Sequence, residues 1–439
     1  MNTPGLPEAF VQSMAEQLGD ELPAFLACYQ MPALRGIRIN PLKPGMKTSR
    51  PEGLLEAVPW AGDGYYLAED SQAGAHPLHE AGAWYIQEPS AMLPACVLAV
   101  KPGESVLDLC AAPGGKTAQL GAMLRGEGLL VSNEIVPARA RILSRNVERM
   151  GIPNALVISA SPDQLAARWE ACFDAVLADA PCSGEGMFRR VPESRAEWQA
   201  QTPAGCAVRQ AEILDAAARM VWPGGRLVYA TCTFSRIENE DTVQRFLERH
   251  RDFALCAFSL PGAEAPGGMI TCYPHRMPGE GQFAALMIRS GDAPARDMGA
   301  DSLPHPDRQA LRAFTAAFPD APQPTGMMGG GLLRMPGCPD LNGLRVLRCG
   351  VRLGELRGSV FVPDHSWAVS AMPPAVPSVP LSGEEARRYQ AGETLPAPDG
   401  LKGWVLPALD GLCLGWGKAG GGVMKNHYPK GLRRPWGGG

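Results

Sequence analysis

Two cysteines each follow closely on a hydrophobic run of the kind that forms strands. Cys182 lies in DAPCSGEG (179–186) and Cys232 lies in ATCTF (230–234). A thiol at the end of a strand lies at the mouth of a sheet, where its thiolate can act as a nucleophile. Each cysteine taken alone can equally be an inert core residue, because free cysteine is among the most buried residue types.

The residues after Cys232 predict a helix that begins close to this thiol. In SRIENE (235–240), Ser235 occupies an N-cap position and Glu238 follows three residues later, which is the capping-box pattern. A nearby helix N-terminus lowers the pKa of a thiol and increases its thiolate fraction. The pattern therefore favours a reactive thiol at Cys232.

A third segment, SVLDLCAAPGGKT (105–117), predicts a strand, a glycine-rich turn and a helix. It is a poor Walker A phosphate loop, because Cys110 stands where that loop has its first glycine. A G-x-G-x-x-G dinucleotide motif is missing too. Glycines still let backbone amides approach a ligand closely.

Glu134 is expected at the end of the next strand, 19 residues after Gly115. A carboxylate there can accept hydrogen bonds from ribose hydroxyls. Glu134 alone can equally be a solvated charge, but together with the glycine turn it predicts an adenosyl-type ligand.

Asp179 opens the first cysteine motif, directly after the apolar run AVLA. A carboxylate in this place either caps a helix or belongs to a site, and the sequence leaves both readings open. Pro181 and the Ser183-Gly184 pair predict a tight loop that presents the thiol of Cys182.

Strand-like and helix-like segments alternate through the middle of the chain, which predicts a parallel, doubly wound α/β sheet. Strands are expected at 104–110, 128–134, 154–160, 173–181, 226–233, 267–273 and 281–289. In such sheets ligands bind at the carboxyl ends of the strands. The candidate residues all fall there: Cys110, Glu134, Asp179, Cys182 and Cys232.

The chain divides into four regions. Residues 1–80 predict an N-terminal extension with two short helices and the strand RGIRIN, and residues 81–292 hold the alternating segments. Residues 293–330 are rich in Asp, Pro and Gly around one short helical stretch, which is typical of a linker. Residues 331–439 predict a small β-rich domain.

Composition excludes several classes of protein. The net charge of −4 argues against a uniformly basic nucleic-acid coat, although local basic patches remain. The 12 cysteines form no C-x-x-C pair and the N-terminus lacks a secretory pattern, which together suit a reducing cytoplasm. No apolar run reaches the ~18 residues of a membrane span. The seven histidines form no cluster with cysteine, so no bound metal is expected.

The successive motifs resemble those of the Sun/Fmu-type (NOL/NOP/Sun) RNA cytosine-5 methyltransferases. The resemblance is carried by YIQEPSAMLP, DLCAAPGGKTAQL, NEIVPARARIL, DAPCSGEGMFRR and ATCTFSRIENE, with IRINPLK before them and GEGQFAALMIR after them. It covers about residues 30–292. The C-terminal segments LRCGVRLGELRGSVFVPDHSWA and GWVLPALDGLCLGWGKAGGGVMKNHYPKGLRR resemble the extra domain of the bacterial small-subunit rRNA methyltransferase F type.

The resemblance implies a Rossmann-like, S-adenosylmethionine-dependent methyltransferase core and a PUA-like C-terminal domain. It implies that Cys232 attacks carbon 6 of cytosine, that Asp179 binds the N3 edge of the base, and that Cys182 helps to release the product. It also implies a set of residues that hold S-adenosylmethionine: Cys110, Ala111, Ala112, Pro113, Gly114, Gly115, Lys116, Glu134 and Asp179. The acidic cofactor contact that this family often carries after its third strand aligns with Ser161, and Asp163 lies two residues further on, so this contact stays open.

The expected partner is RNA, with rRNA of the 30S subunit as the first candidate and no obligate protein partner evident. The N-terminal extension and the PUA-like domain are expected to bind it. Affinity would come from local basic stretches, namely residues 418–434 and MFRRVPESR (187–195). A tRNA methyltransferase is one alternative, and a non-catalytic RNA-binding assembly factor is another. Retention of both Cys182 and Cys232 argues against the second alternative.

Overall fold

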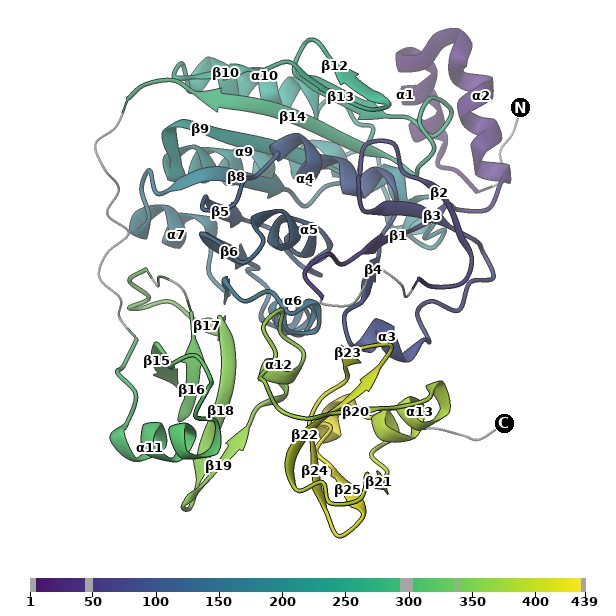
Figure 1. The fold of residues 1–439 in the computed structure, drawn as a ribbon. Coiled ribbons are helices and arrows are strands. Elements are labelled where there is room, and N and C mark those ends of the chain that lie inside the picture. The colour runs from purple at the N-terminus through teal and green to yellow at the C-terminus, as the bar shows by residue number, and fades with distance from the viewer. Residues whose placement is uncertain (1–4, 44–49, 293–302, 336, 338, 436–439) are drawn as a thin grey trace.

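A mixed β-sheet with helices on both faces forms the centre of the molecule (Figure 1). The computed structural model describes residues 5–43, 50–292, 303–335, 337 and 339–435. The strand order is β10-β14-β9-β8-β5-β6-β7-β17, with β13 paired to β14. The strands are β5 (Ser105–Asp108), β6 (Leu129–Asn133), β7 (Ala155–Ile158), β8 (Phe173–Asp179), β9 (Val221–Thr231), β10 (Phe253–Leu255), β13 (Met269–Cys272), β14 (Gln282–Arg289) and β17 (Val346–Cys349).

Strands β5 to β9 pair in parallel, and the other four run antiparallel to their neighbours. Strands β6 and β7 are buried at every residue, as expected when helices cover both faces of a parallel sheet. The predicted doubly wound α/β fold is therefore confirmed, with a parallel centre from β5 to β9. The prediction was wrong for two of the seven expected strands, because β13 and β14 run antiparallel to their neighbours.

Two layers of helices bury the sheet. One face packs against α4 (Leu93–Leu98), α5 (Gly115–Leu124) and α6 (Pro137–Met150), and the other against α7 (Pro162–Arg168), α9 (Thr202–Met220) and α10 (Glu240–Arg249). Helix α6 shows why these segments are helical: Pro137 stands in its first turn and Gly151 ends it with a φ of 73°. Its buried residues recur three and four positions apart, at Ala140, Leu143, Val147 and Met150. Among the described residues, no helix has the length and apolar character needed to cross a membrane.

The helix predicted to begin at Ser235 begins instead at Glu240. Residues 235–239 form turns, in which the amides of Glu238 and Asn239 both donate to the carbonyl of Ser235. The predicted capping box was wrong because the Glu238 carboxylate accepts its hydrogen bonds from Ser183, on another loop. Cys232 consequently lies eight residues before the helix N-terminus.

The N-terminal region contributes two helices and a four-stranded sheet. Its elements are α1 (Glu8–Leu18), α2 (Leu22–Ala27), β1 (Arg35–Ile39), β2 (Leu54–Ala57), β3 (Gly64–Leu67), α3 (Pro77–Glu80) and β4 (Trp84–Ile86). The ring of Phe10 in α1 lies 5.0 Å from that of Phe188, and the ring of Phe25 in α2 lies 5.3 Å from that of Phe234. These helices therefore support the segments that follow both cysteine motifs.

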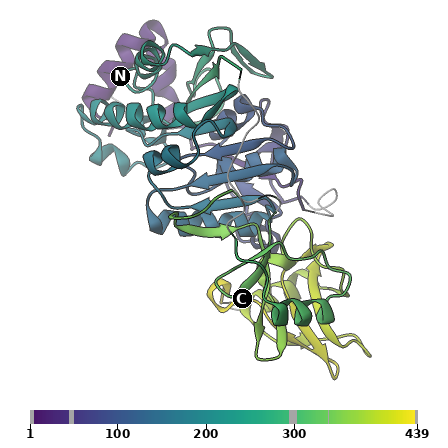
Figure 2. The same ribbon diagram turned by 90° about the vertical axis from the view of Figure 1, so that its left-hand side faces the viewer.

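The C-terminal residues form two smaller sheets in a lobe beneath the central sheet (Figure 2). The strands of the first sheet are β15 (Gly326–Met328), β16 (Gly331–Arg334), β18 (Val351–Arg357) and β19 (Val360–Pro363), and two helices accompany them, α11 (Arg308–Ala317) and α12 (His365–Ala368). The strands of the second sheet are β20 (Ser378–Pro380), β21 (Leu395–Pro396), β22 (Gly403–Leu409), β23 (Leu412–Cys413), β24 (Gly417–Gly420) and β25 (Val423–Asn426), and helix α13 (Gly383–Ala391) accompanies them. Strand β17 connects the lobe to the core, because it pairs with β7 at the edge of the central sheet.

The lobe begins inside the segment 293–330 that the sequence predicts as a linker. Helix α11 is the short helical stretch expected there, and β15 follows it before the segment ends. Residues 293–302 of the segment lie outside the described residues.

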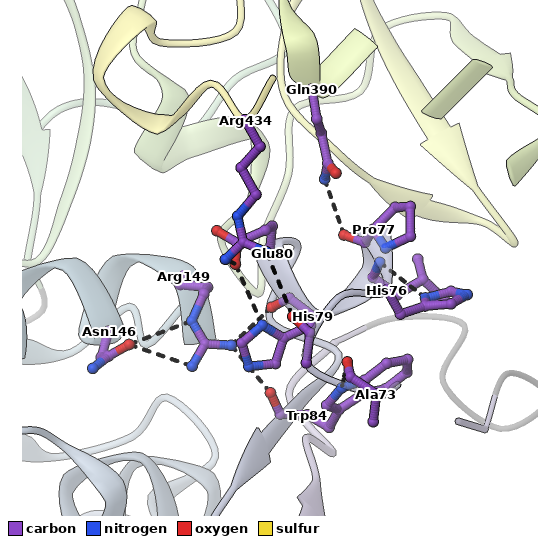
Figure 3. A network of polar contacts seen from close by, with 12 residues as sticks. Ala73, His76, Pro77, His79, Glu80, Trp84, Asn146, Arg149, Gln390 and Arg434 are labelled. Atoms are coloured by element: carbon purple, nitrogen blue, oxygen red, sulfur yellow. Dashed lines mark hydrogen bonds and ion pairs between the residues drawn. The ribbon is translucent and has the colours of Figure 1, made fainter. Parts of the chain in front are cut away.

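The N-terminal sheet and the second C-terminal sheet share one hydrophobic core. It joins Ile37, Leu67 and Trp84 to residues such as Val379, Tyr389 and Val405. Polar contacts surround this core (Figure 3). Arg434 Nη2 donates to Glu80 Oε1 over 2.6 Å, and Gln390 Nε2 donates to the carbonyl of Pro77 over 3.0 Å. The two ends of the chain thus depend on each other for burial.

We expect Trp84→Ala to lower the free energy of unfolding by about 3–5 kcal/mol, because Trp84 is 1% exposed and lies in this shared core. Its indole also donates to the carbonyl of Ala73 over 3.0 Å. Denaturant titration of the purified full chain measures the change. Leu55→Ala, at a side chain 51% exposed in the same sheet, is the matched control and should change the value by less than about 0.5 kcal/mol. Equal effects of the two variants would contradict the shared core.

Candidate active site

Four strands deliver the predicted residues to one cavity of about 690 Å³ at the carboxyl edge of the sheet. Strands β5, β6, β8 and β9 end at or just before the residues concerned. The cavity is lined by Cys110, Ala112, Glu134, Asp179, Cys182 and Cys232 from the predicted set. The remaining predicted residues do not line the cavity: Ala111, Pro113 and Gly114 belong to the adjoining turn, and Gly115 and Lys116 begin α5.

The two cysteine thiols face each other, with 3.3 Å between Cys182 Sγ and Cys232 Sγ. The hydrogen bond to Cys232 raises the pKa of the Cys182 thiol well above its ordinary value, and burial and the charge of Cys232 raise it further. Cys182 therefore keeps its proton at neutral pH and can donate it toward Cys232 Sγ. Burial also raises the pKa of Cys110, the third thiol of the cavity.

Asp179 lines the same cavity as the two thiols and is paired with a lysine whose side chain is 11% exposed. Lys116 Nζ donates to Asp179 Oδ2 over 2.8 Å, and Gln282 Nε2 lies 3.5 Å from Asp179 Oδ1. Burial alone would lower the pKa of Lys116, but the charge and hydrogen bond of Asp179 outweigh it and raise the pKa. Sequence reasoning placed Lys116 on the cofactor, whereas the structure directs its ammonium at Asp179.

The glycine-rich turn has the backbone shape that its sequence predicts. Gly114 has a φ of 112°, and a Cβ there would lie 3.1 Å from Leu143 Cδ1. The N-terminal sheet braces the turn from outside, because Arg38 Nη2 donates to the carbonyl of Gly115 over 2.6 Å and Arg38 Nε donates to Gln87 Oε1 over 2.8 Å. Arg38 belongs to RGIRIN and Gln87 to YIQEPSAMLP. Neither segment taken alone indicates a functional site.

Asp108, at the end of β5, is a buried carboxyl group that sequence reasoning missed. Its Oδ2 accepts a hydrogen bond of 2.6 Å from Thr117 Oγ1, while Oδ1 has no partner among the described residues. Burial raises the pKa of Asp108 to about 7, against the opposing effect of the Thr117 hydrogen bond. The only sequence signal was its place as the last residue of the strand before the glycine turn.

Glu134 has the position that a ribose-binding carboxylate needs. It is 3% exposed and follows β6 directly, and its Oε1 accepts a hydrogen bond of 2.9 Å from the amide of Val136. Its Oε2 lies 3.4 Å from Arg139 Nη1 at the rim of the cavity. A carboxylate, a glycine turn and a cavity within the usual size of ligand pockets fit a nucleoside cofactor such as S-adenosylmethionine.

The cofactor contact expected after the third strand has two candidates, because both Ser161 and Asp163 line the cavity. Ser161 also caps α7, where its hydroxyl accepts from the amide of Gln164 in a reciprocal capping box. The hydroxyl of Ser161 is therefore already engaged, and Asp163 is left as the acidic group at this wall of the cavity.

The basic stretch MFRRVPESR does not offer all its arginines to a ligand. Arg189 Nε and Nη2 bind the two carboxylate oxygens of Glu280 over 2.7 and 2.8 Å, and its side chain is only 7% exposed. The expectation that this basic stretch contributes affinity for RNA is thus wrong for Arg189, because its guanidinium is bound by Glu280 inside the protein. Arg190 remains exposed.

This strand order, with a glycine turn and the carboxylate of Glu134 at the carboxyl edge, is that of an S-adenosylmethionine-dependent methyltransferase. Three family models match the chain in series. The 16S rRNA methyltransferase RsmB/F model matches residues 95–288, the model for the N-terminal domain of 16S rRNA methyltransferase RsmF matches 6–89, and the methyltransferase RsmF PUA domain model matches 376–434.

Curated relatives match over nearly the whole chain. The ribosomal RNA small subunit methyltransferase F of Cronobacter sakazakii is 32% identical over 98% of this chain and 96% of its own. The protein of the same name from Escherichia coli (strain 55989) is 30% identical over the same shares. This chain belongs to the RsmF group of the RsmB/F methyltransferase family, which confirms the resemblance seen in its motifs.

Solved structures agree with the fold. A methyltransferase homologue from Pyrococcus horikoshii is 28% identical, with a TM-score of 0.55 over 65% of this chain and 96% of its own. NSun6 from the same organism, solved with SFG, is 20% identical, with a TM-score of 0.57 over 66% of this chain and 100% of its own. The second likeness supports the fold alone.

Glu134→Ala is expected to weaken S-adenosylmethionine binding by about 1–3 kcal/mol, because the ribose would lose a buried charged acceptor. Isothermal titration calorimetry on the full chain measures this. The matched control is Glu127→Ala, since Glu127 is an exposed carboxylate just before the other end of β6 and should leave the affinity unchanged. An unchanged affinity for Glu134→Ala would remove this carboxylate from the cofactor site.

Proposed function

We propose that this protein forms 5-methylcytosine in RNA, with 16S rRNA of the small subunit as its substrate in the cytoplasm. The observation that carries the proposal is the pair of thiols 3.3 Å apart beside Asp179, both lining the cavity that fits the cofactor. The names of the full-length relatives support rRNA as the substrate.

The first thiol supplies the nucleophile. Carbon 5 of cytosine is a poor nucleophile, so a thiolate must first add to carbon 6 and turn the ring into an enamine-like species. We assign this attack to Cys232, whose thiolate would accept the Cys182 S–H as a hydrogen bond. As the ring gains negative charge, N3 takes up a proton from solvent, and Asp179, held in place by Lys116, accepts a hydrogen bond from that N3–H. S-adenosylmethionine supplies the methyl group that carbon 5 then takes up.

The second thiol fits the release step. After methyl transfer, carbon 5 holds both the new methyl group and its original proton, and the thioether breaks only when a base removes that proton. The hydrogen bond and charge of Cys232 raise the pKa of Cys182 in the free protein. These two contributions end once Cys232 Sγ is bonded to carbon 6, so the pKa of Cys182 falls toward the value that burial alone gives it. Cys182 can then lose its proton to solvent, take the carbon 5 proton, and let Cys232 leave as a thiolate.

The substrate must expose a base to this cavity. Carbon 6 is reachable only when the cytosine leaves its stack, so a single-stranded loop or a splayed base is expected. We propose that the C-terminal residues 331–439 add affinity for RNA. Lys418 and Lys425 face each other across β24 and β25, both exposed, and the Lys418 ammonium lies 5.3 Å from the ring of Trp404.

We expect Cys182→Ser to accumulate as a covalent complex with RNA that survives denaturing gels. Cys232 would still attack and the methyl group would still be transferred, but the carbon 5 proton would stay. The test incubates the variant with rRNA and S-adenosylmethionine and measures the shifted band and the methyl count per protein.

Two controls accompany this test. Cys232→Ala, alone or combined with Cys182→Ser, should give no band and no methylation while binding the cofactor normally. Cys110→Ser changes a third thiol of the same cavity and should also give no trapped band. Normal turnover of Cys182→Ser without a trapped band would overturn the two-cysteine mechanism.

The double variant Lys418→Ala/Lys425→Ala should weaken RNA binding and reduce the slope of log affinity against log salt by about 1.4–1.8, the loss of two phosphate contacts. Filter binding at several salt concentrations measures the slope. Cofactor affinity should not change. Lys101→Ala, at an exposed lysine in the segment between α4 and β5, is the matched control. An unaltered slope in the double variant would count against an RNA contact at β24 and β25.

A further inference from the structure

Glu238 places a buried carboxylate between the two cysteine loops. It lies in the segment between β9 and α10, six residues after Cys232, and is 0% exposed. One oxygen accepts from the amide of Ser183 over 3.0 Å and from Gln210 Nε2 over 2.8 Å, and the other accepts from the hydroxyl of Ser183. Burial raises the pKa of Glu238, and the hydrogen bonds from Ser183 and Gln210 oppose that rise because a carboxylate can accept all of them.

Gln210 extends this contact to the other side of Cys182. It comes from α9, is fully buried, and its Nε2 also donates to the carbonyl of Pro181 over 3.0 Å. The two residues that flank Cys182, Pro181 and Ser183, are therefore both held by the Glu238–Gln210 pair.

The residues that flank Cys232 are tied to the same segment. Asn239, directly after Glu238, accepts from Thr231 Oγ1 over 2.6 Å and donates to the carbonyl of Thr233 over 2.9 Å. The loops also contact each other, because Ser183 Oγ and Thr233 Oγ1 lie 2.8 Å apart. Tyr229 holds the backbone of Glu238 in turn, since its hydroxyl donates to the Glu238 carbonyl over 2.7 Å.

We propose that Glu238, acting with Gln210, is a positioning residue that sets the separation of the two thiols, so that Cys182 can remove the carbon 5 proton from the Cys232 adduct. This inference rests on the proposed cysteine mechanism and adds a residue to it. Glu238 itself touches neither thiol. It acts through Ser183 and Pro181, whose backbone determines where the Cys182 side chain points.

The sharpest variant is Glu238→Gln, which keeps the size of the side chain. A carboxamide can keep its oxygen toward the Ser183 amide and Gln210, but its NH2 group then faces the Ser183 hydroxyl, which must turn round to accept. The charge of the acceptor is lost as well, so the hydrogen bonds that hold both cysteine loops become weaker neutral ones. Displacement of Cys182 by a fraction of an ångström to about 1 Å should slow release by about 10- to 100-fold. Attack by Cys232 needs no contact with Glu238 and should continue.

The experiment compares Glu238→Gln with Glu240→Gln on rRNA and S-adenosylmethionine. Glu240 is the first residue of α10, two residues further on, is partly buried, and contacts Thr271 rather than either cysteine loop. For Glu238→Gln we expect a first methyl transfer close to that of the unaltered protein, about 10- to 100-fold slower turnover, and a covalent band that disappears when Cys232→Ala is added. Glu240→Gln should turn over normally without a band.

Cys182→Ser is run in parallel so that two kinds of failure can be told apart. Suppose that Cys182→Ser traps RNA. The positioning role is then wrong, and the cysteine mechanism stands, if Glu238→Gln turns over normally. The same conclusion follows if Glu238→Gln loses both the first methylation and turnover without giving a covalent band. If neither variant traps RNA, the mechanism itself fails and the inference falls with it. Should Glu238→Gln fail to fold, Gln210→Leu is the second variant, because it removes the contacts with Pro181 and Glu238 from α9. The covalent RNA band then tests the positioning role in the same way.

A second measurement does not depend on methylation. Diamide, a two-electron oxidant of thiols, joins neighbouring cysteines as a disulfide, and two sulfurs 3.3 Å apart are near enough to react. Mass spectrometry of the peptide pair follows the rate of the Cys182–Cys232 disulfide. Glu238→Gln should slow its formation relative to Glu240→Gln, whereas an equal rate in both variants would overturn the claim that Glu238 sets the separation.

Discussion

The parallel pairing of β8 with β9 is the constraint on which the site depends. In this pair Asp179 lies opposite Ala230. Cys182 follows Asp179 by three residues along the chain, and Cys232 follows Ala230 by two residues. Neighbouring strands lie ~4.8 Å apart, which brings the residues just beyond their carboxyl ends within reach of one another. Two motifs 50 residues apart in sequence thereby place their thiols 3.3 Å apart.

Strand ends alone leave the loops free to move, and buried polar contacts restrict them. Glu88 accepts hydrogen bonds from the amides of Ser90, Ala91 and Glu280, which joins the segment before α4 to the segment before β14. Glu280 in turn binds Arg189, in the segment that follows the first cysteine motif. Since an unpaired buried carboxylate is costly, each of these contacts favours the others.

The two ends of the chain are coupled to the core in different ways. Helices α1 and α2 pack aromatic rings against Phe188 and Phe234, directly behind the cysteine loops. The C-terminal lobe adds β17 to the edge of the central sheet, and its second sheet shares a core with the N-terminal sheet. The lobe is therefore attached to the rest of the protein at two separate places, one on the central sheet and one on the N-terminal sheet.

The sequence by itself determined the alternating elements, the glycine turn and the strand-end places of Glu134, Asp179, Cys182 and Cys232, because hydrophobic period and turn residues are local signals. It also indicated the family through the order of its motifs. The tertiary structure decided what distant side chains do. Lys116 turns to Asp179, Arg189 binds Glu280 rather than RNA, and Glu238 joins the cysteine loops instead of capping a helix. Each of these depends on a partner at least 55 residues away in the chain whose approach only the packed sheet creates, and no local pattern records such a pairing.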